Sequence, residues 1–253
     1  MFRVVIPARM GSTRLPGKPL LPLAGRPMIL WVYDRARRCG ATTVVVATDD
    51  ERVASAVREA GGEAMLTADT HASGTDRIAE VARRGQWAHG DIVVNLQGDE
   101  PLMPSELLDQ VAALFEQHPQ AELTTLSVPL ESVNSLLDPN VVKVVAGQDR
   151  RALYFSRAPI PWSRDTALAG LASQRSCAGA QRHIGIYGYR VAALLRLASL
   201  PPSELERLEK LEQLRALEHG MDIRVARACV PPGADVNTAE DLAVAAAWLQ
   251  SGR

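Results

Sequence analysis

Short runs of apolar residues alternate with amphipathic stretches along the first hundred residues of the chain. Three runs have continuous apolar cores (VVI, VVV and IVV), and they span Arg3–Ala8, Thr43–Thr48 and Asp91–Gln97. Continuous apolar runs are typical of strands that are covered on both faces. The stretches between them have the period of helices and span Pro27–Cys39, Glu51–Ala60 and Thr75–Arg84. This order predicts an α/β fold, a three-layer sandwich with a mostly parallel central sheet.

The region 122–190 has a different pattern, in which strand candidates follow one another with few helical stretches between them. The candidates are Glu122–Val128, Val142–Ala146, Ala152–Ser156 and Ile184–Tyr189. We therefore expect a mixed or antiparallel β portion here, a candidate arm or dimer surface. Residues 163–181 are rich in Ser, Ala, Gly and Gln, and we expect them to form a mobile loop.

Helices dominate the remaining parts. One is predicted over Glu106–Gln117, another from a capping box of Ser203 and Glu206 to Gly220, and a last one from about Thr238. The second helix carries leucines three residues apart, at Leu205, Leu208, Leu211, Leu214 and Leu217. That spacing drifts around a helix, which favours one broadly buried helix over a coiled coil. No linker-like change of composition divides the chain, so a single domain over 1–253 is predicted.

Composition excludes several classes of protein. The 253 residues are 47% hydrophobic and 23% charged, with a formal net charge of −1. A disordered chain would be less apolar, a membrane protein would show about 18 consecutive apolar residues, and a DNA-coating protein would be basic. We expect a globular protein without a nucleic-acid partner or membrane insertion. The first 38 residues nevertheless hold eight Arg or Lys residues against one carboxylate, Asp34.

Cysteine usage and the N-terminus favour a cytoplasmic protein. Cys39, Cys177 and Cys229 lie far apart and have no metal-binding spacing, and a low count fits a reducing compartment. Arg9 interrupts the apolar run that follows Arg3. The run is therefore too short for the apolar region of a signal peptide.

A loop rich in glycine and cations follows the first apolar run. It reads ARMGSTRLPGKP over 8–19, and Arg9, Arg14 and Lys18 supply its positive charge. Glycines let backbone amides turn toward an anion at the carboxyl end of a strand, so the loop could hold a polyphosphate. It is not a Walker A loop, because five residues separate Gly11 from Gly17, and it is not the G-x-G-x-x-G fingerprint. An ordinary surface turn is the alternative.

The loop and a series of later segments together resemble a known family. In order, they read PARMGSTRLPGKPL, ATDDERV, SGTDRIAEV, VNLQGDEP, DPNVVKVV, ALYFSRAPIPW, RHIGIYGYR, LEKLEQLRALEHG and NTAEDL. This ordered set resembles the CMP-Kdo synthetases (3-deoxy-manno-octulosonate cytidylyltransferases) over nearly the whole chain.

The resemblance implies a nucleotide-diphospho-sugar transferase-like fold. Within one domain, about 1–120 and 220–253 would form a nucleotide and metal half, and about 121–219 a sugar-binding and dimerisation portion. It implies transfer of CMP from CTP to Kdo, giving pyrophosphate and CMP-Kdo for lipopolysaccharide synthesis. It also implies Mg²⁺ as cofactor and a homodimer.

The resemblance also implies roles for individual residues. Nucleotide contacts would come from Arg9, Gly11, Ser12, Arg14, Lys18, Asp49, Ser73, Gly74, Arg77 and Gln97. Contacts to the acidic sugar would come from Gln97, Arg157, His183, Tyr187, Glu212 and Gln213. The catalytic set would be Arg14, Lys18 and Asp99, the last as a Mg²⁺ ligand. Structural alternatives are a helix cap at Ser73, a satisfied core histidine at His183 and a solvated Glu212.

One position departs from the family pattern. The family has Gly-Val-Asp-Thr near its C-terminus, whereas this chain has Asp235-Val236-Asn237-Thr238. We expect Asn237 to face the metal as an uncharged ligand, with Asp235 as a carboxylate that could compensate. A plain helix cap at Asn237 is the alternative.

Two other functions remain open at this point. A cytidylyltransferase for another acidic sugar, such as an amino-Kdo or a sialic acid, would share most of these motifs. A nucleotide-binding regulator without catalysis is supported only by Asn237.

Overall fold

The computed structural model describes residues 1–11, 15–166 and 170–251. It divides the chain into two compact units. Unit 1 comprises Met1–Ala113, Ile186–Ala198 and Cys229–Arg253, and unit 2 comprises Leu114–Gly185 and Ser199–Ala228. Compared with the two portions expected from the sequence, the main difference is the segment Ile186–Ala198, which belongs to unit 1.

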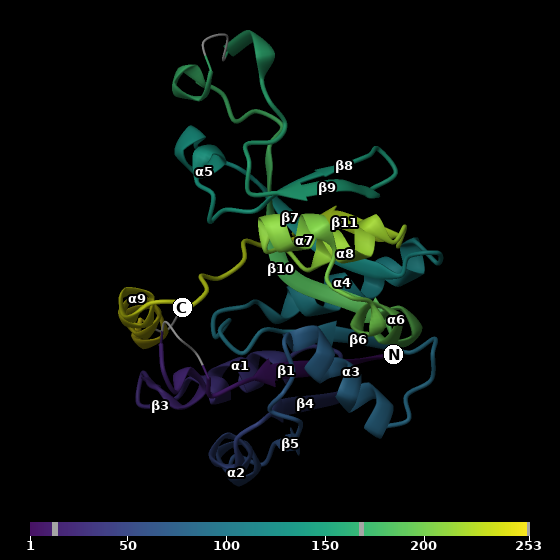
Figure 1. Ribbon diagram of the computed structural model, residues 1–253. Coiled ribbons are helices and arrows are strands. Elements are labelled where there is room, and N and C mark those ends of the chain that lie inside the picture. Colours follow the sequence, from purple (N-terminus) through teal and green to yellow (C-terminus); the bar gives the residue numbers. More distant parts are fainter. Residues whose placement is uncertain (12–14, 167–169, 252–253) are drawn as a thin grey trace. The chain divides into compact units, whose positions relative to one another are not determined.

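Unit 1 is built on parallel strands (Figure 1). They are β1 (Phe2–Ala8), β4 (Thr43–Thr48), β5 (Glu63–Leu66) and β6 (Ile92–Asn95), in the order β6-β1-β4-β5. The last residues of β10 (Gln181–Arg190) pair antiparallel with β6, with Tyr187 opposite Asn95. The three predicted strands and the parallel sheet are confirmed. The sequence pattern missed β5 because its four residues are only partly covered and include no β-branched or aromatic side chain.

Unit 1 also contains several helices. They are α1 (Met28–Ala36), α2 (Glu51–Glu59), α3 (Gly74–Arg84), α6 (Val191–Ser199) and α9 (Ala239–Gln250), and α4 (Ser105–Gln117) continues into unit 2. A 3-10 helix η1 (Lys18–Leu20) and the small pair β2 (Pro22–Leu23) and β3 (Arg26–Pro27) precede α1. Helices α1 and α2 pack together, and α3 packs on β1 and β4. Because the strand order reverses after β5, the α3 connection crosses the face opposite to α1. The helices that the sequence predicted in this part of the chain are confirmed to within a few residues at their ends.

Unit 2 is the mixed β portion that the sequence predicted. Strands β7 (Leu123–Pro129) and β11 (Ile223–Arg227) run parallel, whereas β8 (Lys143–Ala146) and β9 (Ala152–Ser156) form an antiparallel hairpin. The first residues of β10 pair antiparallel with β8. The remaining elements are α5 (Val133–Leu137), η2 (Arg164–Thr166), η3 (Leu171–Ser173), α7 (Glu204–Glu209) and α8 (Gln213–Glu218). Helices η2 and η3 lie in the predicted loop 163–181.

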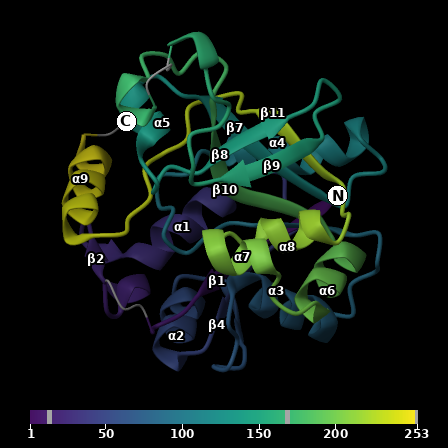
Figure 2. The same ribbon diagram turned by 45° about the horizontal axis from the view of Figure 1, so that its top comes forward.

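The single buried helix predicted over 203–220 is wrong. The capping box of Ser203 and Glu206 starts α7 as expected, but α7 ends at Lys210, which adopts a left-handed conformation with φ of 53°. A second short helix, α8, follows, and Figure 2 shows the two as separate coils. Leu208 is 72% exposed while Leu214 is fully buried, so the drifting leucine row does not pack as one face.

No helix in the described ranges has both the length and the apolar character needed to cross a bilayer.

Candidate active site

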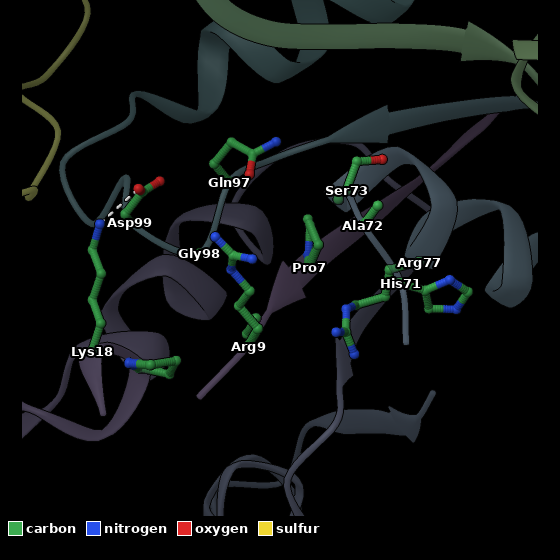
Figure 3. Close-up of a pocket in the computed structure, with 13 residues that line it drawn as sticks. Pro7, Arg9, Lys18, His71, Ala72, Ser73, Arg77, Gln97, Gly98 and Asp99 are labelled. Carbon is green, nitrogen blue, oxygen red and sulfur yellow. Dashed lines mark hydrogen bonds and ion pairs between the residues drawn. The ribbon is translucent and has the colours of Figure 1, made fainter. Parts of the chain in front are cut away.

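A cavity of about 310 Å³ lies in unit 1 at the carboxyl ends of β1 and β6 (Figure 3). Its walls are Pro7, Ala8, Arg9, Lys18, Pro19, His71, Ala72, Ser73, Gly74, Arg77, Gln97, Gly98 and Asp99. The strands β1 and β6 are neighbours where the order of the sheet reverses, which is where open α/β sheets bind ligands. Seven of the predicted site residues meet here: Arg9, Lys18, Ser73, Gly74, Arg77, Gln97 and Asp99.

Glycines allow the three wall segments to come together. A Cβ on Gly98 would lie 2.9 Å from the carbonyl oxygen of Pro7, and one on Gly74 would lie 3.2 Å from the Pro7 ring. The missing side chain of Gly98 therefore lets the loop after β6 approach the end of β1. Any larger residue at Gly98 would push these two walls apart.

Lys18 links the two predicted metal ligands. Its ammonium Nζ donates to Asp99 Oδ2 at 2.7 Å and to Asn237 Oδ1 at 3.4 Å, and its side chain is only 12% exposed. Figure 3 shows the pair of Lys18 and Asp99 on one side of the cavity. Gly17, in a left-handed conformation with φ of 68°, turns the chain into η1 just before this lysine. The structure thus brings three of the predicted site residues together, although 219 positions separate the ends of the cluster.

A buried acid lies next to this cluster. Glu100 is 5% exposed, and burial, with the negative charges of Asp235 and Asp99, raises the pKa of its carboxyl well above the usual value. The charge of Asp235 therefore raises the pKa of Glu100, whereas Asn237 contacts Lys18 directly. The backbone amide of Val236 donates to the Asp99 carbonyl at 2.9 Å and holds the two segments together.

Asp49 and Arg77, both predicted to contact the nucleotide, are paired with each other. Arg77 Nη2 donates to Asp49 Oδ2 at 2.8 Å, and Arg77 Nη1 donates to Thr67 Oγ1. The other oxygen of Asp49 accepts from the backbone amide of Met10 at 3.2 Å. Arg77 is 3% exposed and lines the cavity, whereas Asp49 does not line it. The pair therefore ties the start of the glycine-rich loop to helix α3.

The start of α3 has the cap that the sequence offered as an alternative. Ser73 Oγ accepts from the amide of Asp76 at 3.1 Å, and the Asp76 carboxylate accepts from the amide of Ser73. Ser73 lines the cavity as well, so capping and contact with a ligand are compatible. Gln97 Nε2 donates to Asn95 Oδ1 at 3.1 Å, which orients its amide.

His71 is a wall residue that sequence reasoning missed. Its Nε2 lies 2.6 Å from Glu80 Oε2, and Glu80 also accepts from Arg84 and the amide of Ala68. These contacts lower the pKa of the Glu80 carboxyl although burial opposes them. The only signal in the sequence was the position of His71 two residues before the α3 cap.

The remaining predicted residues lie elsewhere. Gly11 is exposed and does not line the cavity, and Ser12 and Arg14 lie outside the described residues. Tyr187 is in unit 1 on β10, 8% exposed, with its ring 5.9 Å from that of Tyr189. Four sugar candidates belong to unit 2: Arg157, His183, Glu212 and Gln213.

Among these four, Arg157 and His183 have well-defined partners. The Arg157 guanidinium donates to the carbonyl oxygens of Glu209 and Pro139 at 2.6 and 2.8 Å. His183 Nε2 lies 2.9 Å from Thr125 Oγ1, and its ring meets that of Phe155 edge-on. Burial, aided by the positive charge of Arg182, lowers the pKa of His183 to about 3. At neutral pH this imidazole is uncharged, so it can offer hydrogen bonds but no positive charge.

Comparison with known proteins places the chain in a family. A family model described as cytidylyltransferase matches residues 3–223. A 3-deoxy-manno-octulosonate cytidylyltransferase of Thioalkalivibrio sulfidiphilus is 52% identical over 241 residues, 95% of this chain and 96% of that protein. The chain belongs to the 3-deoxy-manno-octulosonate cytidylyltransferase family. Another such enzyme, from Halorhodospira halophila, is 52% identical over 253 residues, and the match covers 100% of this chain and 98% of that protein.

A solved structure supports the same family assignment. It is a CMP:2-keto-3-deoxy-manno-octonic acid synthetase in complex with CTP, 39% identical, with a TM-score of 0.89 over 100% of both chains. The expected α/β fold with a largely parallel sheet is thereby confirmed. A cytidylyltransferase from Leptospira borgpetersenii, 19% identical with a TM-score of 0.58, shares the fold alone.

Proposed function

We propose that the protein transfers CMP from CTP to 3-deoxy-manno-octulosonate, releasing pyrophosphate. The observation that carries this proposal is the 52% identity to curated enzymes of that name over nearly the entire chain. The structural relative in complex with CTP matches the chain from end to end, and six of the predicted nucleotide contacts line the cavity of unit 1. A regulator without catalysis is less favoured, because Lys18 and Asp99 are both present and in contact.

The cavity suits a triphosphate by its charge and by its walls. Arg9 and Lys18 bring positive charge to the end of β1, and Figure 3 shows both side chains at the cavity. In nucleotidyl transfer, a sugar hydroxyl attacks the α-phosphorus in line and pyrophosphate leaves, so catalysis rests on positioning and charge neutralisation. We assign Lys18 to the α-phosphate and Arg9 to the phosphate chain, with Arg14 as a further phosphate cation. Ser73, Gly74 and Arg77 line the opposite wall and suit the base.

Mg²⁺ is the proposed cofactor, and the residues at Asp99 fit it. Mg²⁺ is usually held by one or two protein oxygens together with water and substrate phosphates. The carboxylate of Asp99 and the amide oxygen of Asn237 lie next to the same ammonium, so both could bind one metal ion. The described residues hold no cluster of three or more His, Cys, Asp or Glu side chains suited to a metal. This small donor set therefore matches an ion completed by nucleotide. Bound Mg²⁺ would neutralise phosphate charge and acidify the attacking hydroxyl.

Pyrophosphate release tests the function and separates the alternatives. The protein is mixed with CTP and Mg²⁺, and then with Kdo, an amino-Kdo or a sialic acid in parallel. Release with Kdo at the highest kcat/KM is the expected result. Release only with another acidic sugar would select the second function, and CTP binding without any release would select the regulator. Removal of Mg²⁺ with EDTA should stop the reaction, and added Mg²⁺ should restore it.

Replacement of Asp99 tests the proposed metal ligand. Asp99→Ala should lower kcat at least 100-fold, because a charged oxygen that neutralises the reacting centre is lost. The matched control is Asp69→Ala, an exposed aspartate outside the cavity, which should leave kcat within twofold. Circular dichroism checks that both variants are folded. Full activity of a folded Asp99→Ala variant would refute the metal role.

We also propose a homodimer in the cytoplasm. The support for the dimer is the family resemblance, and sedimentation equilibrium tests it. The three cysteines, Cys39, Cys177 and Cys229, are all free thiols, which supports a reducing compartment.

A further inference from the structure

Three hydrogen bonds join the end of β9 to a single residue at the end of α7, all within unit 2. Ser156 Oγ donates to Glu209 Oε1 at 2.6 Å, and the Arg157 amide donates to Glu209 Oε2 at 2.8 Å. Arg157 Nε donates to the carbonyl oxygen of Glu209 at 2.6 Å. Ser156 is 2% exposed, and Arg157 and Glu209 are half-buried. Glu209 therefore accepts hydrogen bonds from two consecutive residues, with both oxygens of its carboxylate and with its backbone carbonyl oxygen.

The same junction is supported from a second side by a buried lysine. Lys143, on β8, is fully buried, and its ammonium donates to the carbonyl oxygen of Arg157 at 2.6 Å and to that of Asp138 at 2.9 Å. The Arg157 guanidinium also donates to the carbonyl of Pro139. The backbone and the side chain of Arg157 are thus both held, and Glu209 supplies three of the contacts at this strand end.

Glu209 also fixes the segment that carries two other sugar candidates. Lys210 ends α7 in a left-handed conformation, and Glu212 and Gln213 follow within four residues of Glu209. On its far side the turn is fixed by Arg215, which forms a two-pronged ion pair with Glu206 at 2.7 and 2.6 Å. Displacement of Glu209 would therefore move Arg157 relative to Glu212 and Gln213.

We propose that Glu209 is a positioning residue that holds Arg157 and the 212–213 segment in the spacing required by an acidic sugar. This inference deepens the proposed function and rests on it. Glu209 is not among the residues that line the cavity of unit 1, so we expect its replacement to affect the sugar and not the nucleotide. Small displacements of binding groups lower the affinity or the rate of an enzyme by about tenfold to a hundredfold.

The chemistry of the junction supplies a conservative variant. A glutamine at 209 keeps one oxygen to accept from the Arg157 amide, and its NH₂ group can donate to Ser156 Oγ, since a hydroxyl both donates and accepts. Glu209→Gln should therefore keep the geometry, whereas Glu209→Ala should lose both side-chain contacts. Glu204→Ala, at an exposed glutamate of the same helix, is the matched control.

The test is steady-state kinetics with each substrate varied in turn. We expect Glu209→Ala to raise KM for Kdo about tenfold and to leave KM for CTP within twofold. Glu209→Gln should recover most of the loss, and Glu204→Ala should match the unaltered protein. If Glu209→Ala does not fold, Ser156→Ala removes one contact and should raise KM for Kdo about threefold.

Two outcomes contradict the proposal in different ways. An unchanged KM for Kdo in folded Glu209→Ala or Ser156→Ala, or an equal rise in both KM values, would overturn the positioning role. Absence of Kdo-dependent release from the unaltered protein would instead overturn the proposed function, and this inference with it.

Discussion

At the scale of single residues, Asn237 places an uncharged amide oxygen beside the same ammonium that pairs with Asp99. Its Oδ1 lies 3.4 Å from Lys18 Nζ, which pairs with Asp99. Because Mg²⁺ prefers charged oxygen ligands, Asn237→Asp should lower the Mg²⁺ concentration that gives half-maximal activity by about tenfold. The shift of Tm by Mg²⁺ with a non-reacting CTP analogue provides a second readout, independent of turnover.

The control for this prediction is Asp235→Asn, which removes the nearby carboxylate. If Asn237 is the metal ligand, the Mg²⁺ requirement should not change in this variant. A higher requirement in Asp235→Asn, with none of the expected gain in Asn237→Asp, would assign the role to Asp235.

Many of the residues that the family resemblance singled out line the cavity, but the sequence did not predict how they pair. Lys18, Asp99 and Asn237 were predicted as separate contacts to phosphate and metal, and the structure brings them into one cluster. Asp49 and Arg77 were predicted as separate nucleotide contacts, yet they satisfy each other's charge at 2.8 Å. A buried arginine needs a hydrogen-bonding partner. The partner of Arg77 lies in a segment 28 positions away, and a local sequence pattern does not indicate that the two segments approach each other.

At the scale of elements, the start of α9 controls the backbone of Asn237. The Asp241 carboxylate accepts from the amides of Asn237 and Thr238 at 2.8 and 2.9 Å, and Thr238 Oγ1 accepts from the Asp241 amide. Asp241→Ala should cost about 1 kcal/mol, which corresponds to a fall in Tm of about 2–4 °C for a chain of this size. The released backbone should also raise the Mg²⁺ requirement. Thermal unfolding and Mg²⁺ titration measure the two effects.

Glu240→Ala is the matched control in the same first turn, because Glu240 is exposed. Equal Tm values for the two variants would refute the contribution of the cap. The backbone amides of Asn237 and Thr238 lower the pKa of the Asp241 carboxyl. Its contribution should thus be present above the usual pKa of aspartate and be lost as the pH falls through the lower, folded-state value.

Elements with a strong period were predictable, and the exceptions have physical causes. Strands β1, β4 and β6 are buried by helices on both faces, so their apolar runs are unbroken. The segment of α7 and α8 has a capping box and good helix formers throughout. Its break at Lys210 was not predictable, because the contacts of Glu209 with Ser156 and Arg157 are tertiary and override local preference.

At the scale of the whole molecule, the charge of the first 38 residues is partly compensated by distant carboxylates. The sequence has eight cations there against Asp34 alone. In the structure Arg3 pairs with Asp91, and Lys18 pairs with Asp99. The positive field at the cavity is consequently weaker than the count suggests, which favours short-range contacts over long-range attraction for CTP.

The stability of the folded chain should fall in mild acid because of one histidine. Thr125, Phe155 and Arg182 surround His183, and burial with the charge of Arg182 lowers its pKa from 6.5 to about 3. Below pH 6.5 the unfolded chain gains a proton at this site that the folded chain does not, so the free energy of unfolding decreases until the pH reaches about 3. Between pH 7 and pH 5 the loss should be about 1–2 kcal/mol.

Urea unfolding, followed by circular dichroism at pH 7 and pH 5, measures this loss. The other four histidines are the same in both proteins being compared, so His183→Gln isolates the contribution of one site. Glutamine can still hydrogen-bond to Thr125 but takes up no proton in this range. The variant should be less stable than the unaltered protein at pH 7, and the difference should shrink by about 1–2 kcal/mol at pH 5. A difference that stays constant between the two pH values would show that His183 takes up its proton equally well in the folded chain, which would also make it a cation able to pair with the sugar carboxylate.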